Sequence, residues 1–154
     1  MKRKPFPSKV REIKISYSSQ LPPVKERITI RSSKDAYHIL RANWDDEIME
    51  WREEFKVIYV NRANHVLGIS TYSTGSAIGT MVCTRQILAV ALKGNVSGII
   101  LSHNHPSGNE QPSKADKDIT QKMKQAAGYM EITILDHIIM TRDSYYSFAD
   151  EGVL

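Results

Sequence analysis

The sequence predicts an α/β fold in which a mixed sheet is flanked by helices. Strand-like and helix-like segments alternate along the chain, which is typical of sheets that are covered by helices. Residues 96–102 (VSGIILS) are nearly all apolar, as expected of a strand that is buried on both faces. A chain of 154 residues can bury about two-thirds of the surface that it exposes when unfolded, so no covalent staple is needed.

The N-terminal part contains two short strand-like segments followed by a helical segment. Residues 12–18 (EIKISYS) and 26–32 (ERITIRS) are separated by the breaker SQLPP. Residues 32–43 (SSKDAYHILRAN) have apolar residues at helical spacing behind a serine that can cap a helix. Residues 44–54 continue as helix or turn. We therefore expect an N-terminal arm with short strands, residues 1–32, ahead of one domain, residues 33–154.

A hairpin and a buried helix follow. Residues 54–61 (EFKVIYVN) and 65–73 (HVLGISTYS) read as two strands joined by a short turn. Residues 83–95 have the alanine and leucine content of a buried helix, and Gly94 is expected at the C′ position that ends it.

The C-terminal half continues the alternation. After the apolar strand 96–102, residues 113–130 repeat apolar side chains every three or four positions and predict an amphipathic helix that begins at Ser113. Residues 131–141 and 144–151 supply further strand material.

Composition excludes several classes of protein. The single cysteine, Cys83, rules out an intrachain disulfide and any zinc site built on cysteine pairs. No apolar run approaches the roughly 20 residues that a membrane span needs, and the charged N-terminus lacks the apolar core of a signal peptide. We therefore expect no membrane association and a cytoplasmic location.

The formal net charge is +4, and much of it comes from the first 14 residues. Six cations there are opposed only by Glu12: Lys2, Arg3, Lys4, Lys9, Arg11 and Lys14. Such an arm is a candidate for weak contact with DNA, although a solvated tail is the more common role.

The segment 102–116, SHNHPSGNEQPSKAD, predicts a metal site. Residues two apart in an extended segment share a face, so His103 and His105 present both imidazoles toward one point. Asp116 lies three residues after Ser113 and so in the first helical turn, from which it can reach back to the histidines. Two histidines and one carboxylate with an open fourth position make a catalytic zinc site. Taken alone, Ser113 and Asp116 form a helix cap and the two histidines a polar loop, but the joint spacing H-x-H-x7-S-x2-D favours a metal.

This segment resembles the JAB/MPN domain with its JAMM metal motif. The wider run ILSHNHPSG, PSKAD, LDHIIM and SFADEGVL is similar to the RadC branch, over about residues 33–154. The resemblance implies a cytidine-deaminase-like three-layer sandwich and one Zn²⁺ per chain, held by His103, His105 and Asp116. It also implies that Ser113 holds the reacting carbonyl and that an upstream glutamate is the general base.

Spacing alone leaves the identity of the base open among several glutamates before residue 55. The resemblance to an E-x-F pattern in RadC relatives favours Glu53 over Glu54. His137, which follows Asp136 in a predicted strand, is interpreted as packed or supporting and is placed outside the site.

The resulting hypothesis is a bacterial zinc metallopeptidase-like hydrolase that cleaves an amide or isopeptide bond with metal-activated water. The alternative is a nucleic-acid-binding accessory module with a structural or vestigial zinc site. Residues 1–32 show no helix-hairpin-helix pattern, the DNA-binding region usual in RadC-like proteins, which weakens the link to DNA repair. The sequence is also compatible with assembly of identical copies.

Overall fold

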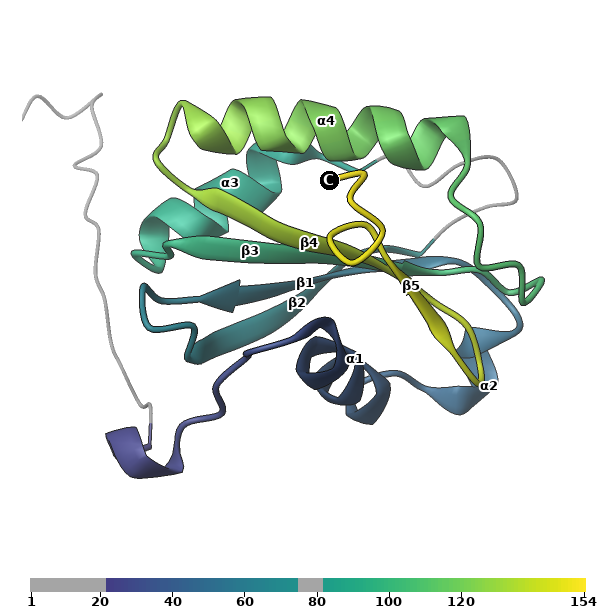
Figure 1. Cartoon of the computed structure of the whole chain (residues 1–154), viewed down its shortest axis with the longest axis horizontal. Helices are drawn as coiled ribbons and strands as arrows, with labels where there is room; N and C mark the ends of the chain where they lie inside the picture. The colour runs from purple at the N-terminus through teal and green to yellow at the C-terminus, as the bar shows by residue number, and fades with distance from the viewer. Residues whose placement is uncertain (1–21, 75–81) are drawn as a thin grey trace, which may run out of the picture.

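A computed structural model describes residues 22–74 and 82–154 of the chain. Its centre is a five-stranded mixed sheet with the strand order β2-β1-β3-β4-β5 (Figure 1). The strands are β1 (Glu54–Val60), β2 (Val66–Thr74), β3 (Gly98–Asn104), β4 (Thr133–Met140) and β5 (Tyr145–Ser147). β3 and β4 run parallel, and the other neighbouring pairs are antiparallel.

Helices cover both faces of the sheet. α1 (Ser33–Ala42) and the short α2 (Asp46–Met49) lie on one side, and α3 (Thr84–Lys93) and α4 (Lys114–Gly128) lie on the other (Figure 1). Every residue of β1 and of β3 is buried. The prediction of a mixed sheet flanked by helices is therefore confirmed.

Two apolar clusters separate the layers. Phe55, Val57 and Tyr59 of β1 pack toward α3 and α4, whereas Ile58 and Val60 pack toward α1. The alternation follows from the pleat, because successive side chains of a strand point to opposite faces. Burial of each large apolar side chain contributes about 1.5–3 kcal/mol.

Most predicted elements are confirmed within a few residues of their bounds, with three differences. The expected strand at 26–32 is wrong: the structure has a 3₁₀ turn, η1 (Val24–Glu26), and a single bridge between Thr29 and His65. Only Tyr145–Ser147 of the segment 144–151 forms a strand. Gly94 is the C-cap of α3 with φ −82°, and the left-handed residue is Asn95, with φ 51°.

Other expectations concern residues that fall outside the described ones. These are the strand at 12–18 and the basic arm with its proposed contact to DNA. Among the helices in the described ranges, none has the length and apolar character of a membrane span.

Candidate metal centre

The two histidines of the motif lie at the end of β3, the central strand of the sheet. His103 belongs to β3 and pairs with Phe55 of β1, and His105 follows directly after the strand. β3 begins and ends two residues later than the predicted strand 96–102, so His103 lies inside the strand and is held by sheet pairing. Its side chain is buried, while that of His105 is only partly exposed, at 17%. The side chains converge, with 3.0 Å between the two Nε2 atoms.

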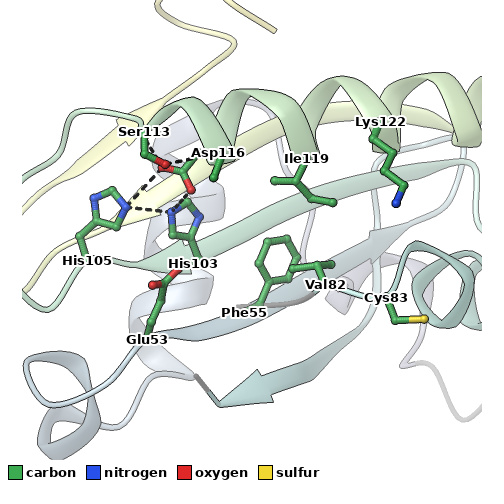
Figure 2. Close-up of a pocket in the computed structure, with 11 residues that line it drawn as sticks. Glu53, Phe55, Val82, Cys83, His103, His105, Ser113, Asp116, Ile119 and Lys122 are labelled. Carbon is green, nitrogen blue, oxygen red and sulfur yellow. Dashed lines mark hydrogen bonds and ion pairs between the residues drawn. The ribbon is translucent and has the colours of Figure 1, made fainter. Parts of the chain in front are cut away.

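Asp116 completes the cluster from the first turn of α4. Ser113 caps this helix, because its Oγ accepts the backbone N–H of Asp116 at 3.1 Å. In return, Oδ2 of Asp116 accepts the backbone N–H of Ser113 at 2.6 Å. Asp116 Oδ1 also lies 3.1 Å from Nε2 of His103, and Oδ2 lies 3.5 Å from Nε2 of His105. The helix cap and the convergence on the histidines thus occur together (Figure 2).

The three side chains have the geometry of a metal site. One ligand atom from each of His103, His105 and Asp116 lies within 4.8 Å of the others. Ligands at about 2.0–2.2 Å from a tetrahedral zinc lie about 3.3–3.6 Å apart, close to the separations in this cluster. The donor set of two imidazoles and a carboxylate also suits zinc.

The hydrogen bond on the far side of His105 leaves its inner nitrogen free for a cation. Nδ1 of His105 lies 2.6 Å from the backbone carbonyl of Asn109. A carbonyl only accepts, so Nδ1 carries the hydrogen, and in the neutral ring Nε2 has a free lone pair. This lone pair faces Nε2 of His103 and the carboxylate of Asp116, an arrangement that needs a proton or a metal ion between the groups.

The protonation equilibria of the cluster agree with this description. The hydrogen bond to Asp116 raises the pKa of His105 above its ordinary value, against the effect of burial, and the Asn109 carbonyl and the charge of Glu53 act in the same direction. Burial acts to raise the pKa of Asp116, but the neighbouring imidazoles of His103 and His105 and the cap with Ser113 hold that pKa well below its usual range. Without metal, a proton on His105 is therefore stabilised, and metal must displace it.

Glu53 and Glu54 have different surroundings. Glu53 lines the same cavity as His103, His105 and Asp116, and its carboxylate points toward the histidines (Figure 2). The carboxylate of Glu54 is buried and lies 3.3 Å from Nζ of Lys56, with Arg52 at 3.6 Å. Glu54 is thus held in an ion pair, whereas Glu53 forms no ion pair within the part of the chain that the structure describes.

Asn104, between the two histidines, holds the segment that carries Glu53. Its Oδ1 accepts the backbone N–H of Glu54 at 2.7 Å, and its Nδ2 donates to the carbonyls of Met49 and Arg52 at 2.8 and 2.9 Å. The side chain is fully buried. Sequence reasoning missed this residue, and its position inside the H-x-H tripeptide was the available signal.

The cavity above the cluster has a volume of about 740 Å³. One end holds the polar residues of the cluster, and mostly apolar side chains line the rest, together with Lys122 at the far end (Figure 2). The lining comprises Glu53, Phe55, Val82, Cys83, His103, His105, Ser113, Ala115, Asp116, Ile119 and Lys122. A polar reacting group and an apolar neighbouring group can therefore bind side by side.

His137, which sequence reasoning placed outside the site, contacts His103. Its Nε2 lies 2.8 Å from Nδ1 of His103, and its Nδ1 lies 2.6 Å from Oγ1 of Thr120 on α4. Burial lowers the pKa of His137 well below its ordinary value, with the nearby His103 and His105 acting in the same direction, so the ring is neutral. The histidine next to Asp136 was visible in the sequence, but no spacing rule linked it to the motif.

Comparison with known proteins gives a consistent result. A family model described as a RadC-like JAB domain matches residues 30–153. A UPF0758 protein of Flavobacterium johnsoniae is 43% identical over 124 residues, which cover 80% of this chain and 53% of that protein. The UPF0758 protein YeeS of Escherichia coli K12 is 42% identical over 67% of this chain and 70% of its own length. A UPF0758 protein of Thermotoga maritima is 39% identical over 67% of this chain and 46% of its own length. The chain thus spans about half the length of some of the relatives that it matches.

Proposed function

The chain belongs to the RadC-like JAB domain family, and from this membership and the site we propose that it is a zinc-dependent hydrolase of amide or isopeptide bonds. One observation carries the proposal. The Nε2 atoms of His103 and His105 and the carboxylate of Asp116 converge at one end of a cavity that also contains Glu53. The cytidine-deaminase-like identity of the fold belongs to the same proposal.

His103, His105 and Asp116 would hold one Zn²⁺. The bound ion supplies Lewis acidity, which polarises a carbonyl and makes water acidic enough to react near neutral pH. The remaining chemistry belongs to the side chains of the protein.

Glu53 acts as the general base. Its carboxylate faces the histidines from the opposite wall of the cavity, without the cationic partners that hold Glu54 (Figure 2). There it can accept a proton from water and pass that proton to the leaving amine, a role that contributes typically about 10²–10⁴-fold in rate.

Ser113 stabilises the oxygen of the scissile carbonyl. Its Oγ accepts one hydrogen bond from the backbone of Asp116, which leaves the hydroxyl hydrogen free to donate into the cavity. A donor aimed at a developing negative charge is worth about 10²–10³-fold in rate.

The substrate is proposed to be a peptide or an isopeptide, because both present a carbonyl beside apolar groups that fit the lining of the cavity. A cytoplasmic location and assembly of identical copies remain predictions. So does the alternative of DNA binding through the basic arm, which rests on residues 2–14.

Zinc binding and hydrolysis test the proposal together. Metal-free protein is titrated with Zn²⁺ in competition with a chromophoric chelator, and the loaded protein is incubated with a library of short peptides and lysine-linked isopeptides that is read by mass spectrometry. We expect one zinc per chain and zinc-dependent cleavage. His103→Ala should lose both, and Glu53→Gln should lose cleavage alone.

His38→Ala is the matched control, because His38 is an exposed histidine on α1, outside the cavity. It should keep both zinc and cleavage. A wild-type site that takes up no added zinc, or cleavage that persists in Glu53→Gln, would contradict the proposal.

A further inference from the structure

A buried chain of hydrogen bonds runs from His103 back to the first turn of α4. Nδ1 of His103 lies 2.8 Å from Nε2 of His137, and Nδ1 of His137 lies 2.6 Å from Oγ1 of Thr120. Oγ1 of Thr120 in turn lies 2.5 Å from the backbone carbonyl of Asp116. His103 is 1% exposed, and His137 and Thr120 are 0% exposed, so no bulk water competes for these bonds.

The direction of every bond in this chain follows from its last member. The carbonyl of Asp116 can only accept, so the single hydroxyl hydrogen of Thr120 is donated to it. The oxygen of Thr120 must then accept from Nδ1–H of His137. His137 is fully buried, and its two ring nitrogens bond to Thr120 and His103 rather than to a carboxylate that would balance a charge, so the ring is neutral. Its lone pair is then on Nε2 and accepts from Nδ1–H of His103. The hydrogen of His103 is thereby placed on Nδ1, and its Nε2 is left with a lone pair that faces Asp116 and His105.

We propose that His137, oriented by Thr120, is a positioning residue that fixes His103 in the tautomer and ring orientation required to bind a metal through Nε2. The inference rests on the proposed function, because it takes His103 as a zinc ligand. It goes further in assigning a role to two residues outside the motif, on α4 and β4.

The packing around His137 supports this role. The ring stacks on Phe148, with centroids 4.8 Å apart and an interplanar angle of 16°, and meets the edge of Phe55 at 5.9 Å. Both aromatic residues are buried and offer no competing acceptor. The position of the imidazole is therefore set by packing, while its hydrogen bonds determine which nitrogen of His103 is protonated.

The chain of bonds also links two ligands. It starts at the ring of His103 and ends at the backbone carbonyl of Asp116, whose carboxylate lies 3.1 Å from the same ring. A shift of α4 would therefore disturb both the hydrogen bonds through Thr120 and the contact between the Asp116 carboxylate and His103. Partners of this kind behind a metal ligand are typically worth about 10–100-fold in metal affinity.

Four variants separate the hydrogen bonds from the packing. His137→Leu removes both ring nitrogens, and His137→Gln can restore an acceptor near the position of Nε2. Thr120→Val removes the hydroxyl with little change of shape, and Thr120→Ser retains it. Circular dichroism and thermal melting establish which variants are folded, and Thr120→Val keeps the test available if His137→Leu does not fold.

Two measurements are made on each folded variant. In the metal-free protein, long-range ¹⁵N–¹H correlation spectra identify the protonated ring nitrogen of His103. We expect Nδ1–H in the wild type and in Thr120→Ser, and a mixture of tautomers in His137→Leu and Thr120→Val. Zinc affinity from chelator competition should fall about 10–100-fold in His137→Leu. His137→Gln should recover part of this loss, and Thr120→Ser should bind as the wild type does.

The outcomes distinguish this inference from the proposed function. An Nε2–H tautomer of His103 in the wild type, or unchanged zinc affinity in both folded His137→Leu and Thr120→Val, would overturn the positioning role and leave the hydrolase proposal intact. Absence of zinc binding by the wild type would overturn both.

Discussion

The carboxylates of Glu53 and Glu54, neighbours in the sequence, lie on opposite sides of the sheet. Glu53 lines the cavity of the histidines, whereas Glu54 pairs with Lys56, whose ammonium lies over the ring of Trp44 on the α1 side. This separation assigns different consequences to two similar substitutions.

Glu53→Gln should lower turnover by at least about 100-fold, because it removes the proposed base, while zinc affinity and the free energy of unfolding stay near the wild-type values. Glu54→Gln should instead lower the free energy of unfolding by about 3 kcal/mol, because Lys56 loses its buried partner. Hydrolysis rates and urea unfolding measure the two effects. A stable Glu54→Gln protein that lacks turnover, beside an active Glu53→Gln protein, would reverse the assignment.

Ser113 has two roles that substitution can separate. Ser113→Ala should lower the free energy of unfolding by about 1 kcal/mol, because α4 loses its cap. The same variant should also lose turnover. Ser113→Asn retains a capping side chain and should stay close to the wild type in stability, yet lose about 10²–10³-fold in rate. If the serine serves only as a cap, the asparagine variant will hydrolyse substrate at the wild-type rate.

Asn104→Ala should separate positioning of the base from binding of the metal. The substitution leaves two buried backbone groups and one partly buried one without their side-chain partner, so the free energy of unfolding should fall by several kcal/mol, at about 1–3 kcal/mol for each buried group. Turnover should fall because the segment before β1 loses its anchor. Zinc affinity in the folded protein should stay within a few-fold, because both histidines are retained. Chelator competition below the melting temperature checks this, and a large loss of affinity would contradict it.

The stability of the metal-free protein should depend on pH through two histidines with opposite shifts. His105 has a pKa raised above the ordinary 6.5, so its contribution is complete below pH 6.5 and is lost as pH rises through the raised pKa. His137 has a lowered pKa, so its contribution is complete above pH 6.5 and is lost as pH falls below that value. Urea unfolding from about pH 5 to 9 should therefore show that the free energy of unfolding falls as the pH becomes alkaline. This fall should be absent in His105→Gln. An equal decrease of the unfolding free energy with rising pH in the wild type and in the variant would contradict the prediction.

Two glycines test the packing of the fold. A Cβ on Gly98 would lie 2.8 Å from Cδ1 of Leu135 and 2.9 Å from Cγ2 of Val60, so Gly98→Ala should cost about 1–3 kcal/mol of unfolding free energy. Gly128, at the end of α4, has open space around its Cα, and Gly128→Ala should be neutral or stabilise by up to about 1 kcal/mol. Thermal melts of the two variants provide the comparison. Equal melting temperatures would show that the β3–β4 region adapts more readily than its packing indicates.

The sequence predicted those parts of the site that depend on local geometry. His103, His105 and Asp116 lie within 14 consecutive residues, so strand periodicity and a helix cap were sufficient to bring them together. The alternation of strand-like and helix-like segments also predicted the mixed sheet flanked by helices, because strands and helices repeat their apolar residues at different periods. The role of each side chain in catalysis and metal binding remains a prediction.

Other features depend on packing between distant segments. His137 meets His103 only because β4 runs parallel to β3 and α4 places Thr120 over both. The failed strand at 26–32 has the composition of a strand, but within the described residues only Thr29 is bridged, to His65 beyond the end of β1. Whether an alternating segment forms a strand depends on the partner that the rest of the fold offers, which periodicity does not contain.

The short span of the three ligands has a consequence for how activity is acquired. The three ligands lie at the end of one strand and the start of the next helix, whereas Glu53 is brought to them by the pairing of β1 with β3, some 50 residues away in the chain. The proposed metal ligands and the proposed base therefore come from parts of the chain that are far apart in the sequence. Under the proposed function, turnover would therefore depend on the docking of β1 against β3, whereas the three ligands come from one continuous segment of the chain.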